Sequence, residues 1–248
     1  MSKFFTNNFS ITSVYKKPST KSEIVTQMIF GDSFLILKKT GKWLKIKIKE
    51  DNYKGFIKDK NFSDFIRASH KVKLLKANVY KYPSQKNKIR ELSFGSKIKV
   101  IDQNNKFYRF IGGWIKKNDT KPILIKEKNL FRKVNIFKNV KYKWGGKSFK
   151  GIDCSALVQV FMNFNNLYCP RDTKDQLRYF KKNISLYNVK KNDILYWKGH
   201  VAIALSKKSL IHAYGPSKKT VTMNTLKTIN LIKKTANLKL LSIKRVKI

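Results

Sequence analysis

The chain reads Tyr142-Lys-Trp-Gly-Gly-Lys-Ser-Phe-Lys-Gly-Ile-Asp-Cys-Ser-Ala-Leu-Val-Gln-Val-Phe161 across the stretch that decides the fold of its C-terminal part. The glycines of this stretch predict a loop in which the backbone passes close to a ligand. Asp153 is suited to cap a helix at its N-terminus, and the apolar residues after it recur at helical spacing. We therefore predict that a helix begins at Cys154.

Cys154 lies in the first turn of this predicted helix. The helix dipole stabilises a thiolate there and is expected to lower the thiol pKa. The backbone N–H groups of a first turn have no partners within the helix, so they can hold an oxyanion. These features predict a nucleophile, and a buried structural cysteine is the alternative. Cys169 has neither the glycine loop nor the cap, and we predict a structural role for it.

A nucleophilic cysteine needs a base, and two histidines occupy neighbouring strand candidates. His200 opens an alternating run in which Ala202 and Ala204 share its face. These small residues leave room for a helix on that face. If this helix is the one predicted after Asp153, His200 faces Cys154. His212 follows in the next strand candidate. An antiparallel pairing of the two strands would bring the imidazoles together, so that one orients the other.

Other roles remain open for the histidines. Together with Cys154, His200 and His212 could instead bind a metal ion, which would require a fourth ligand and a carboxylate beside a histidine. His70, between two β-rich regions, is predicted to be a solvated loop residue. Catalysis by a cysteine and a histidine needs no metal or other cofactor, so none is expected.

The N-terminal part, residues 10–66, consists of short β-like runs separated by turns. Phe34–Leu37 and Trp43–Ile48 are strand candidates, and the second alternates apolar residues with lysines. The turns are predicted at Gly31-Asp32, Thr40-Gly41 and Asp51-Asn52.

Residues 70–118 repeat the layout of this first region. Three pairs of landmarks occur in the same order: Val14-Tyr15 and Val79-Tyr80, Phe30-Gly31 and Phe94-Gly95, and Gly55-Phe56-Ile57 and Gly113-Trp114-Ile115. An internal repeat of this kind predicts two copies of one small closed β-barrel of about 50–55 residues each. Residues 119–134 are predicted to form a linker.

The charge of the chain is extreme, with 56 Lys and Arg residues against 14 Asp and Glu residues, a net charge of +42 over 248 residues. One explanation is a polyanionic partner such as nucleic acid. The other is a codon bias, because only seven of the cations are arginine, the residue that specific base and phosphate recognition favours. We expect no specific nucleic-acid partner, although a positive surface attracts anionic substrates.

No apolar run approaches the roughly 18 residues of a membrane-spanning helix, so membrane insertion is not expected. The first residues lack the apolar stretch of a secretory signal. Two cysteines cannot form a disulfide scaffold, and both observations favour the cytoplasm. The oligomeric state is unknown from sequence.

The ordered motifs of the chain resemble two known families. The N-terminal pattern Val-Tyr-x-x-Pro, Gly-Lys-Trp-Leu-Lys-Ile and Tyr-x-Gly-Phe-Ile resembles the bacterial SH3-like domain. The motifs Tyr-x-Trp-Gly-Gly, Asp-Cys-Ser-x-Leu-Val, Pro-Arg-Asp-Thr-x-Asp-Gln, Asn-Asp-Ile-Leu-Tyr-Trp, Gly-His-Val-Ala-Ile and Leu-Ile-His-Ala follow in order from 142 to 213. They resemble the NlpC family of papain-like cysteine peptidases, which cut bacterial wall peptides.

The resemblance implies roles for individual residues. It makes Cys154 the nucleophile, His200 the base and His212 the orienting residue. The substrate-binding residues that it implies or that lie in its motifs are Tyr142, Asp153, Ser155, Arg171, Asp172 and Tyr53. Among these, the Ser155 N–H and the Tyr142 hydroxyl would stabilise the oxyanion. Arg171-Asp172 would face the cleft, with a surface ion pair as the alternative.

The combination also resembles the intracellular branch of the family, which recycles muropeptides. The implied reaction is hydrolysis of the γ-D-glutamyl bond to a diamino acid in peptidoglycan-derived peptides with a free N-terminal L-alanine. The first SH3-like unit would read that amine, through Tyr53 and an acidic residue among Asp51, Asp32 and Glu50. Rival functions are a cell-wall amidase or acyltransferase on the same fold, and a non-catalytic SH3-like protein that binds anionic ligands.

We therefore expect an α+β protein made of two small SH3-like β-barrels and a papain-like catalytic domain. The expected divisions are residues 1–66, 67–120 and 121–248.

Overall fold

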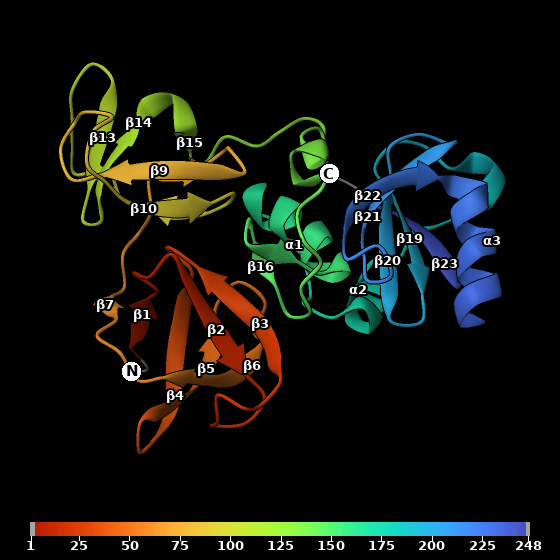
Figure 1. Ribbon diagram of the computed structural model, residues 1–248, viewed down its shortest axis with the longest axis horizontal. Helices are drawn as coiled ribbons and strands as arrows, with labels where there is room; N and C mark the ends of the chain where they lie inside the picture. The colour runs from red at the N-terminus through yellow and green to blue at the C-terminus, as the bar shows by residue number, and fades with distance from the viewer. Residues whose placement is uncertain (1–2, 247–248) are drawn as a thin grey trace. The chain divides into compact units, whose positions relative to one another are not determined.

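The computed structural model describes residues 3–246, so the first two and last two residues of the expected domains lie outside it. The chain folds into two compact units. The first comprises the residues up to Lys126 together with Lys147–Phe149, and the second comprises Glu127–Gly146 together with the residues from Lys150 onward. Strands dominate both units and the second also carries α-helices, which confirms the α+β class (Figure 1). The three-domain division at 66 and 120 stays a prediction.

In the first unit, an antiparallel sheet surrounds the first apolar core. In spatial order its strands are β3 (Ile24–Ile29), β2 (Ile11–Tyr15), β6 (Lys54–Lys58), β5 (Trp43–Ile48), β4 (Ser33–Thr40), β1 (Phe4–Thr6) and β7 (Ser63–Asp64). Strand β5 has the predicted bounds, and its Leu44, Ile46 and Ile48 are buried. Gly31, Gly41 and Asn52 have positive φ at the predicted turns, a conformation that Gly and Asn adopt readily.

The second copy of the repeat forms a sheet with the same strand order. Its strands are β10 (Lys88–Ser93), β9 (Lys76–Tyr80), β14 (Gly113–Lys116), β13 (Phe107–Phe110) and β12 (Asp102–Gln103). Tyr80 pairs with Trp114 just as Tyr15 pairs with Phe56 in the first sheet. The strand order and these equivalent pairs confirm the internal repeat. Beside this sheet lie β11 (Lys97–Ile98), β8 (His70–Val72), the 3-10 turn η1 (Lys117–Asp119) and β15 (Thr120–Pro122).

Two expectations for this region were wrong. His70 is not in a solvated loop but begins β8, where its ring lies 4.6 Å from that of Tyr108. Burial lowers the pKa of His70. The start of the expected linker is also ordered, because Thr120 and Lys121 pair with β8 as part of β15. Neither short strand shows alternation, so sequence pattern could not reveal them.

A charge cluster in the first unit is formed by the buried Asp32 and Lys147 and the partly buried Lys97 and Glu50. It is called the buried charge cluster below. The Lys147 amine donates to Asp32 at 3.2 Å, and the Lys97 amine binds Glu50 at 2.5 Å. Burial raises the pKa of Asp32, but the charges of Lys147 and Lys97 outweigh burial and hold this pKa below its ordinary value. The Gln27 side-chain oxygen accepts the backbone N–H of Lys147 at 3.0 Å. The strand β16 (Lys147–Ser148) is therefore bound within the first unit.

The second unit is built on an antiparallel sheet with helices on both faces (Figure 1). In spatial order the strands are β18 (Asn183–Ile184), β23 (Ser242–Arg245), β19 (Asp193–Trp197), β20 (His200–Ala204), β21 (Ser209–Tyr214) and β22 (Lys219–Asn224). The α-helices are α1 (Cys154–Phe164), α2 (Thr173–Tyr179) and α3 (Thr225–Ala236). The unit also contains the short strand β17 (Gly151–Ile152) and the 3-10 turns η2 (Val134–Phe137) and η3 (Leu186–Asn188).

The second half of the expected linker is part of this unit. Phe131 and Phe137 are buried, and each ring lies about 6 Å from that of Phe161 in α1 (6.0 and 5.8 Å). Their backbone is irregular or 3-10, so it leaves no periodic pattern to recognise. The segment thus supports the helix that begins at Cys154.

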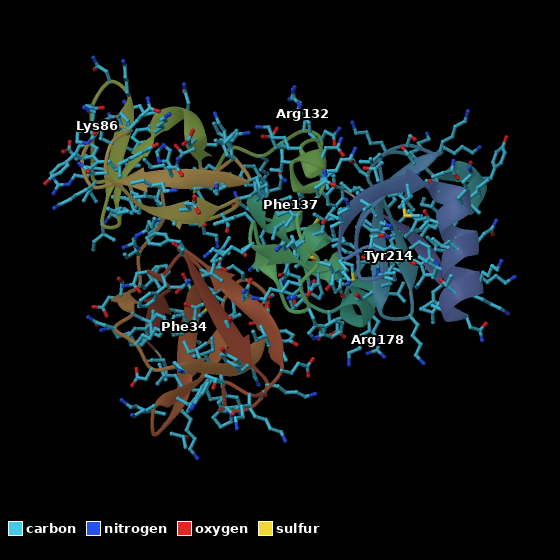
Figure 2. All side chains as sticks on the ribbon, viewed as in Figure 1. Phe34, Lys86, Arg132, Phe137, Arg178 and Tyr214 are labelled. Atoms are coloured by element: carbon cyan, nitrogen blue, oxygen red, sulfur yellow. The ribbon has the colours of Figure 1, made fainter. Side chains whose placement is uncertain are left out.

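Lysine and arginine side chains, among them Lys86 and Arg178, extend from the surfaces of both units (Figure 2). Phe34, Phe137 and Tyr214 are instead buried in their units. Among residues 3–246, no helix is long and apolar enough to cross a membrane.

Candidate active site

Asp153 caps α1 as the sequence predicts. Its Oδ1 accepts the N–H of Ala156 at 2.8 Å, and its Oδ2 accepts the N–H of Gly145 at 3.0 Å. The glycine loop and the start of the helix are therefore held by one carboxylate. In the described part of the chain, the N–H groups of Cys154 and Ser155 have no hydrogen-bond acceptor, so they remain to bind an oxyanion.

Arg171 is the partner of that carboxylate, which sequence did not reveal. Its guanidinium binds both oxygens of Asp153 and donates to the Ser155 hydroxyl at 2.8 Å. Both members of the ion pair are buried. The alternative of a surface ion pair between Arg171 and Asp172 is therefore wrong. Asp172 instead occupies the N-cap position of α2.

The thiol of Cys154 lies where β20 begins. Its Sγ is 4.0 Å from the carbonyl oxygen of Gly199, to which the thiol donates. The backbone N–H of Val201 and the side chain of Thr173 also hydrogen-bond to the sulfur. Gly199 and Val201 are the two chain neighbours of His200. The sulfur of Cys154 therefore contacts the backbone directly before and after His200.

The predicted lowering of the Cys154 pKa was wrong. Burial and then the charge of Asp153 raise this pKa to about 11, against the opposing effects of the Val201 N–H, Arg171 and Thr173. The helix dipole acts over one turn of backbone, whereas desolvation reflects everything packed around the sulfur. The resting cysteine is therefore a thiol that needs a base.

The two predicted histidines lie together. Nε2 of His200 and Nδ1 of His212 are 2.9 Å apart on adjacent antiparallel strands. Burial lowers the pKa of His200 to about 4. Burial and the neighbouring His200 also lower the pKa of His212. Both imidazoles are therefore neutral near pH 7, and His200 can accept a proton.

A helix does lie on the face of Ala202 and Ala204, but it is not the one that begins at Cys154. These alanines share a core cluster with Ile232 of α3, whereas α1 lies against β20 and β21 on the other side of the sheet (Figure 1). Small residues indicate close packing but not which helix provides it. The thiol approaches β20 at its first residues rather than across this face.

Aromatic rings enclose the histidines. The Tyr214 ring stacks on His212 at 4.6 Å and 10°, and the Trp197 ring lies 5.7 Å from that of His200. Burial raises the pKa of the Tyr142 phenol, and the nearby sulfur of Cys154 is the second cause of this rise. The hydroxyl therefore keeps its proton and can donate a hydrogen bond. Tyr214 could have been inferred from its spacing of two residues from His212. Trp197 and Thr173 could be placed at the site only once the fold was known.

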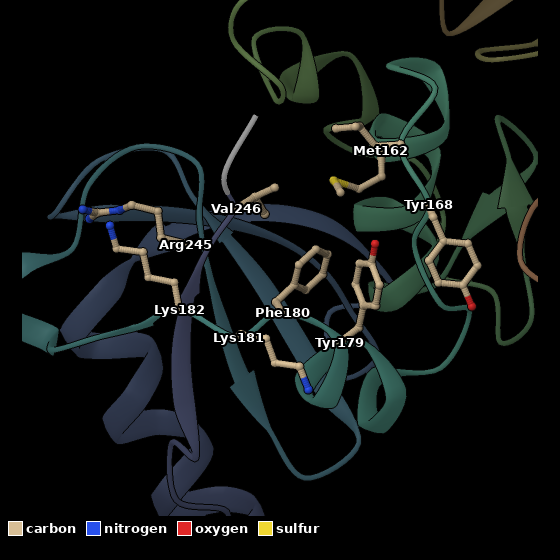
Figure 3. A pocket seen from close by; sticks show the side chains of 9 residues that line it. Met162, Tyr168, Tyr179, Phe180, Lys181, Lys182, Arg245 and Val246 are labelled. Atoms are coloured by element: carbon tan, nitrogen blue, oxygen red, sulfur yellow. The ribbon is translucent and has the colours of Figure 1, made fainter.

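Cys169 lies at the other end of α1 and is fully buried. Its Sγ donates to the Pro170 carbonyl at 3.5 Å, and its own carbonyl accepts from Gln159 at 3.0 Å. This surrounding fits the predicted structural role. A cavity of about 650 Å³ also lies at this end of α1, where Tyr179 and Phe180 point toward Met162 (Figure 3). It is distinct from the site of Cys154.

The candidates for recognition of an amine belong to the first unit. Tyr53 packs against the core of the first sheet, and its N–H donates to Asp51 at 3.0 Å. Asp32 and Glu50 are ion-paired with lysines in the buried charge cluster. Among residues 3–246 there is no group of three or more His, Cys, Asp or Glu side chains that could hold a metal ion.

A thiol at a helix start, with paired histidines on an antiparallel sheet, is the arrangement of a papain-like cysteine peptidase. Residues 139–238 match the NlpC/P60 family, and residues 14–62 match the bacterial dipeptidyl-peptidase Sh3 domain. The chain thus carries an NlpC/P60 domain and is a hydrolase acting on peptide bonds.

Relatives of similar length support the same assignment. The chain is 24% identical to a gamma-D-glutamyl-L-lysine dipeptidyl-peptidase of Bacillus subtilis, over 85% of this chain and 79% of the relative. It is 26% identical to dipeptidyl-peptidase 6 of Lysinibacillus sphaericus, over 82% of this chain and 84% of the relative. The crystal structure of an NlpC/P60 family protein from Bacillus cereus has the same fold, with a TM-score of 0.84 at 19% identity, covering 98% of this chain and 99% of that one.

Proposed function

We propose that this peptidase hydrolyses the γ-D-glutamyl bond to a diamino acid in peptidoglycan-derived peptides with a free N-terminal L-alanine. The observation that carries the proposal is the Cys154 thiol bound by the backbone on both sides of His200, which is itself hydrogen-bonded to His212. The names of the Bacillus subtilis and Lysinibacillus sphaericus relatives support the choice of bond and of a dipeptide product.

The reaction follows from the protonation states of the site. His200 is neutral and takes the proton of the Cys154 thiol, which is otherwise weakly acidic. The thiolate attacks the γ-carbonyl carbon, and the resulting oxyanion is bound by the N–H groups of Cys154 or Ser155 and by the Tyr142 hydroxyl. The protonated His200 then gives its proton to the leaving amine. Water hydrolyses the thioester and restores the thiol.

The remaining predicted residues serve recognition or position. The buried Arg171 holds Asp153, so it supports the start of α1 rather than touching the substrate. Asp172 precedes α2 near Thr173, which bonds the thiol, and its carboxylate suits a substrate amine. Tyr53 is the candidate from the first unit.

Action on free wall fragments in the cytoplasm is part of the proposal. Neither Cys154 nor Cys169 forms a disulfide in the described chain, and this is compatible with a reducing compartment. Detection of the protein in the cytoplasmic fraction of the source cells supports this part, and its recovery from the wall fraction contradicts it.

The direct test is incubation with L-Ala-γ-D-Glu-L-Lys and its diaminopimelate counterpart, followed by mass identification of the products. Release of L-Ala-γ-D-Glu by the wild type and by Cys169→Ser, but not by Cys154→Ser, is expected. Cleavage at another bond would indicate the amidase alternative, and binding without cleavage would indicate the non-catalytic one.

A second comparison tests recognition of the amine. The same peptides with an acetylated N-terminus should be cut at least about a hundredfold less efficiently in kcat/KM, because acetylation removes the charge that the proposed acidic acceptor binds. Equal kcat/KM values for free and acetylated peptides would remove the support for action on free fragments.

A further inference from the structure

The second nitrogen of His212 has an unexpected neighbour. Nε2 of His212 lies 3.3 Å from the thioether sulfur of Met223, on the adjacent strand β22. His212 pairs with Val221, so the side chain of Met223 reaches along the sheet to the ring. His212 is fully buried, and its ring is covered by Tyr214.

The chemistry of sulfur decides which way this contact runs. A thioether has no hydrogen to donate and can only accept, so Nε2 of His212 carries the hydrogen. A neutral imidazole carries one hydrogen, and Nδ1 of His212 is therefore an acceptor. The hydrogen between the two histidines must then belong to Nε2 of His200, at 2.9 Å. Nδ1 of His200 is left with its lone pair.

We propose that Met223 is a positioning residue of the peptidase, whose thioether fixes the tautomers of both histidines so that Nδ1 of His200 is the base. The proposal rests on the proposed function, in which His200 takes the proton of Cys154. It extends the pair of histidines by one residue, so that Met223 orders the protons of His212, and His212 orders those of His200.

The opposite order of protons would disable the site. With hydrogen on Nδ1, His212 would donate to Nε2 of His200, and Nδ1 of His200 would carry a hydrogen instead of a lone pair. Such an imidazole cannot accept the thiol proton. Holding a catalytic imidazole in the right tautomer has a large effect in other hydrolases. Here the acceptor is a weak one, so a smaller effect is expected.

The first experiment reads the tautomers directly. Long-range ¹⁵N–¹H spectra of the wild-type protein at neutral pH show which nitrogen of each histidine carries hydrogen. Hydrogen on Nε2 of both His200 and His212 supports the proposal, and hydrogen on Nδ1 of either one overturns it. This measurement needs no substrate, so it is independent of whether the proposed function holds.

The second experiment removes the acceptor. Met223→Leu keeps the size of the side chain, and Met162→Leu is the matched control at a buried methionine of α1. Met223→Leu should lower kcat about five- to tenfold, the scale of a single hydrogen bond, with KM unchanged. It should also add Nδ1–H signals of His212. Met223→Gln, whose amide oxygen accepts, should recover kcat to within about twofold.

Alternative results contradict the proposal in distinct ways. An unchanged kcat in Met223→Leu, or a loss equal to that in Met162→Leu, would mean that the sulfur only fills space. A fall in both Met223 variants with unchanged His212 tautomers would mean a packing role.

Discussion

A buried cysteine that forms no disulfide lies at each end of α1, and the surroundings of the two differ. At the first residue, the sulfur of Cys154 is met by the Gly199 carbonyl, the Val201 N–H and the Thr173 side chain. Beyond the last turn, the sulfur of Cys169 donates to the carbonyl of Pro170 at 3.5 Å. Burial therefore does not distinguish a nucleophile from a structural cysteine, whereas a place at a capped helix start beside the strand of His200 does.

The largest expected difference between the two ends is in activity. Cys154→Ala should abolish peptide cleavage, because no other group can form the thioester, and Cys169→Ala should keep it. Cleavage assays with both variants, with circular dichroism to check folding, measure this contrast. Residual cleavage by Cys154→Ala above the uncatalysed rate would break the comparison.

The two ends should also differ in their contribution to stability. Arg171→Met leaves the Asp153 carboxylate buried without its cation, which costs about 3–5 kcal/mol of unfolding free energy. Gln159→Met, at the Cys169 end, removes a neutral hydrogen bond worth about 1 kcal/mol. Urea unfolding gives both values. Equal losses would show that the ion pair at Asp153 does not support the helix start more strongly.

The free energy of unfolding should depend on pH through His200. The pKa of His200 is lowered to about 4 in the folded chain from an ordinary 6.5. Between these values the unfolded chain binds a proton that the folded chain does not, so stability falls as pH drops from 6.5 to 4. Unfolding measured across this range should show a shallower fall in His200→Gln. An identical fall in the variant would place the dependence elsewhere.

His200→Ala should reduce kcat by at least about a hundredfold, the scale of losing a general base. His212→Asn should be milder, because an amide can still orient the neighbouring imidazole. Steady-state kinetics on the free tripeptide provides the values. If the His212 variant were the more damaging of the two, the assignment of base and orienting residue would be reversed.

The smallest expected difference between the two cysteines is in their rate of alkylation. Cys154 is slightly exposed and Cys169 is fully buried, at 6% and 0% of their surfaces. Iodoacetamide should therefore label Cys154 first, by at least about tenfold in rate, and labelling should quicken as pH rises toward the raised thiol pKa of about 11. Peptide mass analysis at several pH values locates the label. Earlier labelling of Cys169 would contradict the assignment of the nucleophile.

Local features of this site could be predicted from sequence because they depend on neighbouring residues. The cap by Asp153, the helix start at Cys154 and the meeting of His200 with His212 all follow from short-range patterns. The internal repeat of the first unit could also be recognised in the sequence, because its turns need glycine at fixed places.

Features that depend on distant packing could not be predicted. The raised pKa of Cys154 reflects burial by the whole unit, and the helix beside Ala202 depends on how the chain crosses the sheet. Met223 reaches His212 only through the register of β21 and β22, which no pattern in the sequence records. Arg171 was found as a motif residue, but its partner Asp153 required the fold.

The anchoring of Lys147 has a consequence for the evolution and engineering of this protein. Its side chain is 2% exposed and is neutralised by Asp32, a residue more than a hundred positions earlier in the chain. A gene fragment that starts at residue 121 would encode this lysine without its counter-ion and without Gln27, which accepts its backbone N–H. We therefore expect that the segment from residue 121 onward cannot be transferred to another protein by itself. A transplant that keeps residues 1–120, or that replaces Lys147 by a neutral residue, should be better tolerated.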